Sequence, residues 1–428
     1  MSRSDHSQFS SINSPLPSGY KQTEVGVIPE EWEVSPLGAL AETSSGTTPA
    51  RAMHDRYFKN GSIAWVKTMD LTDSELFGTS ECVTDLALKE TCLRVYPAGT
   101  VLVAMYGGFQ QIGRTGLLRT PASVNQAITA IQPKAERLVS EYLLGALNYR
   151  VDYWKSVASS SRKDPNISSQ DIRNFPIACP RPPEQRAIAT ALSDVDALLG
   201  GLDRLIAKKR DLKQAAMQQL LTGQIRLPGF HGEWEVTTLG EVATFTSGGT
   251  PSRSNDGYWC GEIPWISATS LRCFEIWRSP SNVTEEAVAA GSKIAPIGST
   301  LLLVRGSALH NEILCGLVTK RVCFNQDVKA LIPSSRVYPR FLTWLITGRA
   351  EDFLKLVSSA GNTAGVLDTK LLKAFEFLLP EAHEQTAIAA VLTDMDAELA
   401  VLEQRQAKTR DLKQGMMQKL LTGKTRLV

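Results

Sequence analysis

Two stretches of this chain, 200 residues apart, read almost alike and decide its fold. Residues 184–223 read EQRAIATALSDVDALLGGLDRLIAKKRDLKQAAMQQLLTG, and residues 384–423 read EQTAIAAVLTDMDAELAVLEQRQAKTRDLKQGMMQKLLTG. At this offset about 26 of the 44 positions from 184 to 227 are identical. A period this long predicts a duplicated domain and not a solenoid, with pseudo-twofold symmetry.

Both stretches have the pattern of a long helix. Pro182, Pro183 and Glu184 suit a first helical turn, where N–H groups lack partners and the helix dipole favours negative charge. Apolar residues then recur in steps of four and three, as in a heptad seam. Each helix is expected to span about 40 residues and to end near Gly223 or Gly423. The predicted seam residues are Ile188, Leu192, Val195, Leu199 and Leu202 in the first copy and Ile388, Leu392, Met395, Leu399 and Leu402 in the second.

One such helix cannot bury its apolar stripe alone, so the two copies predict an antiparallel coiled coil with each other. The alternative is that each helix packs only on its own domain. Gly200 and Gly201 disfavour a helix by roughly 1 kcal/mol each, which predicts a local irregularity in the first copy.

The two longer regions are related more loosely. Trp32-Glu33-Val34 matches Trp234-Glu235-Val236, and Gly46-Thr47-Thr48-Pro49 matches Gly248-Gly249-Thr250-Pro251. Strand-like runs separated by turn residues predict α/β (α+β) domains in two copies. Strands are predicted at Ile63–Val66, Thr100–Ala104, Ala127–Ile131, Thr300–Val304 and Val328–Ile332, and helices at Ser140–Lys155 and Arg340–Leu356. The predicted segments are a disordered tail (1–20), a first domain (21–180), a central helix (181–228), a second domain (229–380) and a C-terminal helix (381–428).

Composition limits the function classes. The 428 residues are 43% hydrophobic and 21% charged, which is typical of two or three globular domains. No apolar run approaches the 18 or more residues of a membrane span, and no secretory signal is visible, so a cytoplasmic protein without a membrane partner is expected. Seven scattered cysteines without a Cys-x-x-Cys pair argue against a disulfide framework or a zinc ribbon. The net charge of +2 neither indicates nor excludes nucleic acid.

Motifs of catalysis are missing. Gly423-Lys424-Thr425 imitates the end of a P-loop, but Gln418 occupies the position of the required glycine, and the segment ends a helix. His310, Cys315 and Cys323 could form a ligand set, although ordinary burial is the better reading. The sequence therefore predicts a binding protein with no catalytic residues and no metal site.

Together these features resemble the specificity subunit of type I restriction–modification enzymes. The resemblance covers nearly the whole chain. It rests on Pro182–Ala189 and its copy from Glu381, on the two Leu-Leu-Thr-Gly helix ends, on Lys21–Trp32 and on Ser247–Ser252.

The resemblance implies that each longer region is a target recognition domain that reads one half of a split, asymmetric sequence in double-stranded DNA. The two helices would form the coiled coil that spaces the domains. Two methyltransferase subunits would dock on it, and two motor–endonuclease subunits would join for cleavage in phage defence. This subunit would bind no cofactor, because S-adenosylmethionine, ATP and Mg²⁺ serve the partners.

Residues that differ between the copies are the better candidates for reading DNA, since the two domains read different half-sites. Arg can read guanine, and Asn or Gln can read adenine. The candidates are Lys67, Gln111, Arg114, Arg162 and Lys163 in the first domain and Arg305, Asn311 and Asn362 in the second. Residues shared by both copies, such as Gly46–Pro49 and Asn125-Gln126, are expected to be architectural. The main alternative is a duplicated scaffold whose domains bind proteins and not DNA.

Overall fold

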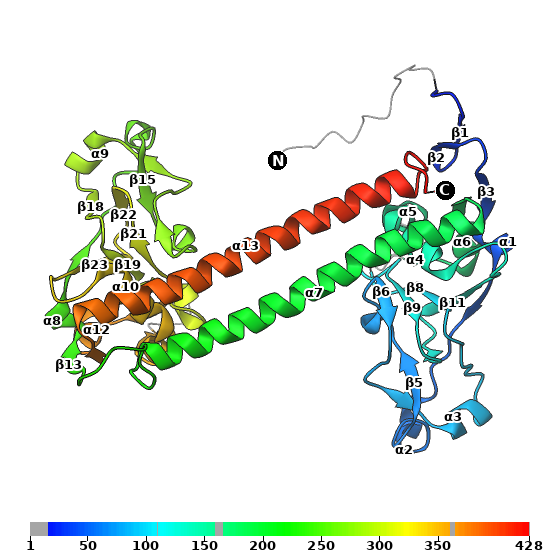
Figure 1. Ribbon diagram of the computed structural model, residues 1–428, viewed down its shortest axis with the longest axis horizontal. Coiled ribbons are helices and arrows are strands. Elements are labelled where there is room, and N and C mark those ends of the chain that lie inside the picture. The colour runs from blue at the N-terminus through cyan, green and yellow to red at the C-terminus, as the bar shows by residue number, and fades with distance from the viewer. Residues whose placement is uncertain (1–15, 109, 159–165, 360–363, 428) are drawn as a thin grey trace. The chain divides into compact units, whose positions relative to one another are not determined.

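The two repeated stretches form two helices of 39 residues each, α7 (Pro182–Leu220) and α13 (Ala382–Leu420), in the computed structural model (Figure 1). The structure describes residues 16–108, 110–158, 166–359 and 364–427. The helix prediction is confirmed. The predicted irregularity is wrong, because α7 runs unbroken through Gly200 and Gly201. The neighbouring Leu202 is buried, and this packing offsets the small glycine cost of roughly 1 kcal/mol per residue.

The chain folds as two compact units that divide both helices. The first unit comprises Met1–Gly201 with Gln406–Val428, and the second comprises Leu202–Arg405. Each unit therefore holds one α/β domain, one half of α7 and one half of α13. This division differs from the segments predicted from the sequence, which kept each helix whole and apart from the domains.

Within each unit the two helix halves run antiparallel. In the second unit Lys213 forms an ion pair with Asp396, and Lys209 Nζ lies 2.7 Å from Glu398 Oε1. In the first unit Lys413 Nζ lies 2.6 Å from Asp196 Oδ1. Lys413 and Asp196 occupy the same positions of the repeat as Lys213 and Asp396, but each residue lies on the other helix. Only an antiparallel arrangement of the two helices allows both pairs. The fold is thus the predicted one, with paired long helices.

All ten predicted seam residues are buried or half-buried. Ile188 and Leu192 join the core of the first α/β domain, and Ile388 and Leu392 join that of the second. The first three turns of each helix therefore pack on their own domain, as the alternative prediction held. Further along α13, Leu399 and Met217 of α7 line the same groove within the second unit.

The first domain is built on a five-stranded sheet with the order β4-β11-β8-β9-β6, and it also holds the smaller sheet β10-β5-β7. Its strands are β1 Tyr20–Thr23, β2 Gly26–Pro29, β3 Glu33–Pro36, β4 Ala41–Ser45, β5 Ile63–Val66, β6 Ser74–Leu76, β7 Cys82–Val83, β8 Val101–Ala104, β9 Thr115–Leu118, β10 Ser123–Val124, β11 Ile128–Pro133 and β12 Pro176–Cys179. Its helices are α1 Leu37–Leu40, η1 Arg51–Met53, α2 His54–Tyr57, η2 Thr68–Asp70, α3 Asp85–Glu90, α4 Ser140–Tyr149, α5 Val151–Val157 and α6 Ser169–Arg173.

The second domain repeats this plan, with the five-stranded order β14-β23-β19-β21-β16 and the smaller sheet β17-β15-β22-β18. Its strands are β13 Glu235–Thr238, β14 Ala243–Ser247, β15 Ile263–Ile266, β16 Glu275–Ile276, β17 Asn282–Val283, β18 Lys293–Ala295, β19 Thr300–Leu303, β20 Arg305–Gly306, β21 Cys315–Val318, β22 Val322–Phe324, β23 Val328–Pro333, β24 Val357–Ser359, β25 Gly365–Leu367 and β26 Glu376–Leu379. Its helices are α8 Leu239–Val242, η3 Asp256–Tyr258, η4 Ala268–Ser270, α9 Glu285–Ala289, η5 Ser307–His310, α10 Pro339–Gly348, α11 Ala350–Leu354 and α12 Thr369–Lys373.

The five predicted strands are all present as β5, β8, β11, β19 and β23. The two predicted domain helices are each broken in two. Arg150 separates α4 from α5 with φ −107° and ψ 31°, and Arg349 separates α10 from α11 in the same way. The Arg150 guanidinium lies over the Phe175 ring and donates to the Pro176 carbonyl oxygen at 2.6 Å. This tertiary contact holds Arg150 in the non-helical conformation, and a local pattern cannot reveal it.

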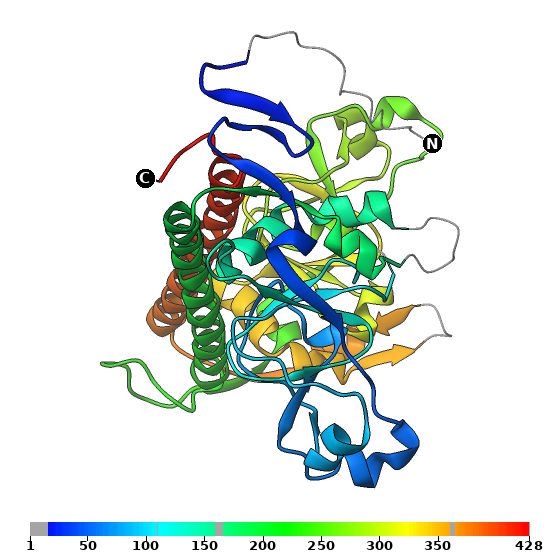
Figure 2. The same ribbon diagram turned by 90° about the vertical axis from the view of Figure 1, so that its right-hand side faces the viewer.

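The predicted disorder of residues 1–20 is wrong at its C-terminal end, and residues 1–15 lie outside the described residues. Tyr20 begins the hairpin β1–β2, which Figure 2 shows beside the end of α13. The Tyr20 hydroxyl donates to the Gly423 carbonyl oxygen at 3.0 Å. All seven cysteines carry unpaired thiols, as their scatter suggested.

Candidate nucleic-acid interface

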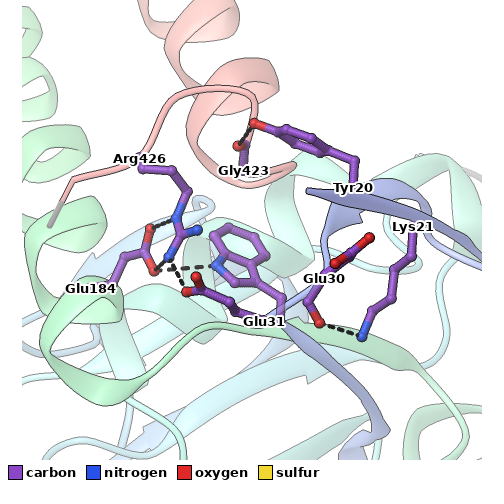
Figure 3. Close-up of polar contacts among 8 residues, drawn as sticks. Tyr20, Lys21, Glu30, Glu31, Glu184, Gly423 and Arg426 are labelled. Carbon is purple, nitrogen blue, oxygen red and sulfur yellow. Dashed lines mark hydrogen bonds and ion pairs between the residues drawn. The ribbon is translucent and has the colours of Figure 1, made fainter. Parts of the chain in front are cut away.

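A buried carboxylate at the start of each long helix joins the adjacent α/β domain to the segment after the end of the other helix. Glu184 of α7 is 3% exposed, and it accepts hydrogen bonds from Trp32 Nε1 at 3.2 Å and from Arg426 at 2.5 and 2.9 Å (Figure 3). Arg426 also reaches Glu31 at 3.3 Å, and these carboxylates raise the pKa of its guanidinium. We call this trio of Trp32, Glu184 and Arg426 the first clasp.

The second unit holds the same arrangement. Glu384 is 1% exposed and accepts from Trp234 Nε1 at 3.0 Å and from Arg226 at 2.5 and 2.6 Å. We call Trp234, Glu384 and Arg226 the second clasp. Each clasp joins the start of one long helix to the segment after the end of the other, so the helix ends and the domains are fixed together within each unit.

Away from the clasps, several loops converge in each domain at the ends of β8 and β19. In the first domain the 105–114 loop joins β8 to β9, and Met105 N–H donates to the Ala127 carbonyl oxygen at 2.8 Å. Gln126, which precedes Ala127 in the chain, accepts a hydrogen bond at its side-chain oxygen from the Thr48 hydroxyl. Gln111 Nε2 lies 3.2 Å from Met69 Sδ, which brings the 67–70 loop to the same place.

The second domain brings together the corresponding loops. Val304 N–H donates to the Asp327 carbonyl oxygen at 2.8 Å, and Thr250 Oγ1 donates to Gln326 Oε1 at 2.5 Å. Arg305, in the short strand β20, therefore begins the β19–β21 connection, which lies against the same turn as the β8–β9 loop does in the first domain. In both domains, corresponding loops are held by the same backbone segments. We call these segments the frame: residues 46–49 with 125–127 in the first domain, and 248–251 with 325–327 in the second.

The residues shared between copies build this frame, as the sequence suggested. A Cβ atom on Gly46 would lie 2.2 Å from the Asn125 carbonyl oxygen, and one on Gly248 would lie 2.2 Å from that of Phe324. Only glycine allows this close backbone approach. The Gly-Thr-Pro segments thus hold the loops against each other, and no base reading is needed to explain their repetition.

The structure brings five of the eight candidate DNA-contacting residues to these loops. Arg305 and Asn311 are exposed, while Gln111 and Arg114 are half-buried. No hydrogen bond or ion pair within the described ranges engages the guanidinium of Arg114 or Arg305, so both retain their donors. The remaining three candidates, Arg162, Lys163 and Asn362, lie outside the described residues.

Lys67 differs from the other candidates because it already has a partner. Its Nζ lies 2.8 Å from Glu81 Oε2, and Glu81 also forms an ion pair with Arg51. Hydrogen bonds from Arg51 first and from Lys67 second lower the pKa of Glu81 to about 2. At neutral pH this carboxylate is charged and offsets the positive charge of Lys67.

Sequence reasoning missed a pair of arginines beside the loops. The Arg51 guanidinium lies over Phe58 and Trp65, and that of Arg253 lies over Trp259 and Trp265. A signal was present, because an arginine follows each Gly-Thr-Pro segment by two positions. In the described part of the chain, no three His, Cys, Asp or Glu side chains gather in a way that could hold a metal ion. The described helices include none with the length and apolarity of a membrane span.

The comparison with protein families gives one match. The model of the type I restriction modification DNA specificity domain matches twice, at residues 29–207 and 231–409. These two ranges cover most of the chain and correspond to its two repeats.

Individual relatives carry related names. The EcoR124I/EcoR124II specificity subunit of Escherichia coli is 30% identical over 258 residues, which cover 58% of this chain and 62% of that protein. The MjaIX specificity subunit of Methanocaldococcus jannaschii is 26% identical over 272 residues, which cover 59% of this chain and 61% of that protein. These matches span less than two thirds of either relative.

A solved structure has the same fold. The crystal structure of a type I restriction–modification S subunit from M. genitalium superposes with a TM-score of 0.57 at 16% identity, over 91% of this chain and 96% of that one. The prediction of a specificity subunit, and not of a catalytic one, agrees with the names of these relatives. With two matches to the family model over most of its length, the chain belongs to the type I restriction–modification DNA specificity family.

Proposed function

We propose that this chain is the non-catalytic, DNA-reading subunit of a cytoplasmic type I restriction–modification complex. Each recognition domain reads one half of a bipartite, asymmetric sequence in double-stranded DNA. The observation that carries the proposal is that two copies of one frame present corresponding loops with different side chains. Gln111 stands where Asn311 stands in the other copy, while Arg114 ends the first loop and Arg305 begins the second, as expected if the frame is constant and the bases read are not.

The partners and cofactors follow from the same proposal. Two methyltransferase subunits dock on the paired helices, and two motor–endonuclease subunits complete the assembly. S-adenosylmethionine, ATP and Mg²⁺ are used by those partners and not by this chain. Supporting this, the half of α7 that belongs to the second unit exposes Leu205 and Leu212 at a spacing of seven residues, an apolar face that suits a protein partner.

A gel-shift titration of the chain assembled with its methyltransferase subunits tests the proposal against the protein-binding scaffold. We expect DNA affinity to fall steeply as salt rises, since a DNA reader neutralises phosphates. We also expect one sequence among random duplexes to bind far more tightly than the rest. Salt-insensitive binding, or equal affinity for all sequences, would favour the scaffold.

Arg114→Ala and Arg305→Ala are each expected to weaken binding to the cognate sequence by about 1–3 kcal/mol and to relax one half-site. Both guanidiniums lie on the converging loops and keep their donors. Selection from a library of randomised targets measures the loss, position by position. Arg137→Ala and Arg336→Ala are the matched controls, because these arginines lie beside the starts of α7 and α13, where Gln185 and Gln385 bond their carbonyl oxygens. If Arg114→Ala or Arg305→Ala impairs subunit assembly but leaves half-site selectivity unchanged, these loops do not read DNA.

A further inference from the structure

The two recognition domains share an aromatic platform that holds one arginine flat. The Arg51 guanidinium carbon lies 4.5 Å from the Phe58 ring centroid and 4.9 Å from that of Trp65. The platform is fixed to the loop frame, because Trp65 Nε1 donates to the Thr47 carbonyl oxygen at 3.2 Å. Stacking on a ring leaves the edge of a guanidinium, with its N–H donors, directed outward.

The second domain builds the same platform. The Arg253 guanidinium carbon lies 4.4 Å from the Trp259 centroid and 5.3 Å from that of Trp265. Trp265 Nε1 donates to the Gly249 carbonyl oxygen at 3.2 Å, as its counterpart does in the first domain. Arg253 is exposed, and it follows Pro251 of the shared frame by two positions.

The guanidinium N–H donors of Arg51 and Arg253 face different side chains. Glu81 pairs with both Arg51 and Lys67 in the first domain. The corresponding position in the second domain is Ser281, since Trp65 N–H donates to the Glu81 carbonyl oxygen and Trp265 N–H to that of Ser281, at 2.9 and 2.8 Å. Across the described ranges no carboxylate forms an ion pair with Arg253.

We propose that Arg253 binds a backbone phosphate of the DNA, and that Glu81 prevents Arg51 from making the same contact. This proposal rests on the proposed function. Arg253 follows the Gly-Thr-Pro segment of the shared frame and does not lie in the loops that differ between the copies, which favours a contact with what all DNA shares, the sugar–phosphate backbone. A held guanidinium offers two parallel donors to phosphate oxygens. The second domain therefore contributes a backbone contact that the first domain lacks.

The salt dependence of binding by the assembled complex tests this on a non-specific duplex and on the cognate duplex. Each phosphate contact contributes about 0.9 to the slope of log affinity against log salt. Arg253→Gln is expected to lower the slope by about 0.9 on both duplexes and to weaken binding about tenfold at low salt. Ser281→Glu is expected to do the same without altering Arg253, which covers the case in which Arg253→Gln fails to fold.

Two control variants complete the design. Arg253→Lys keeps the charge and is expected to keep the slope. The charge-neutral double variant Arg51→Gln with Glu81→Gln is expected to leave the slope unchanged, because this arginine makes no phosphate contact. The slope of the wild-type complex on non-specific DNA is measured separately from its sequence selectivity, so failure of the proposed function shows as missing selectivity.

An unchanged slope in both Arg253→Gln and Ser281→Glu would overturn the inference. A loss confined to the cognate duplex would also overturn it, because that result assigns Arg253 to a base. A slope that falls in the Arg51/Glu81 double variant would show that Glu81 does not block the first domain.

Discussion

Aspartate at both Leu199 and Leu399 is expected to destabilise the chain by about 4 kcal/mol or more, because it places charges where the helices are paired. Leu399 is 7% exposed and Leu199 is half-buried. In the second unit Leu399 lies in the groove lined by Met217 and Lys213 of α7. Urea unfolding followed by far-UV circular dichroism measures the loss, since the signal at 222 nm reports chiefly on helix.

The matched control places the same charges on the outer faces of the same helices. Leu198 and Val401 are exposed, and each lies within two residues of the seam position it controls for. The double variant Leu198→Asp with Val401→Asp is expected to unfold within about 0.5 kcal/mol of wild type. If both double variants unfold at the same urea concentration as wild type, the long helices do not depend on one another.

Glu184→Ala is expected to lower the free energy of unfolding by about 3 kcal/mol, because it leaves buried or half-buried donors without their acceptor. The lost carboxylate serves both Trp32 Nε1 and Arg426 in the first clasp. Glu384→Ala breaks the second clasp and should cost a similar amount in the second unit. Urea unfolding monitored by tryptophan fluorescence is the measurement, since each clasp contains a tryptophan.

The control for the clasp is Glu33→Ala. Glu33 is a largely exposed neighbour whose ion pair with Arg137 is long, at 4.0 Å. We expect a change within about 0.5 kcal/mol for this variant, as for most exposed pairs. The free energy of unfolding of Glu184→Gln should fall between those of Glu184→Ala and Glu33→Ala. The glutamine retains an acceptor for Trp32 but loses the charge that pairs with Arg426. Equal stability of Glu184→Ala and Glu33→Ala would contradict the role given to the clasp.

The long helices could be predicted from the sequence because their signal is local and occurs twice. A step pattern of four and three, begun by Pro182 and ended near Gly223, needs no tertiary contact to be read. The antiparallel pairing followed from duplication, since an unpaired stripe would stay exposed. The buried runs of β8 and β19 were similarly visible as short apolar segments between turns.

Other features depended on contacts between residues far apart in the sequence. The break at Arg150 follows from Phe175, and the first clasp joins Glu184 to Arg426 across 242 positions. The arginine platforms required the knowledge that Trp65 lies against the loop at residue 47. Lys67 was chosen because it differs from Ser267, but the same comparison does not reveal that Glu81 already binds it.

Mapping modified bases in genomic DNA tests the central claim most directly, in cells that express this chain with its methyltransferase partner. We predict one methylated motif made of two short specific parts separated by a fixed number of unread base pairs. Arg114→Ala should make one part degenerate, and Arg305→Ala the other. Methylation without such a split motif, or relaxation of the same part by both variants, would contradict the account.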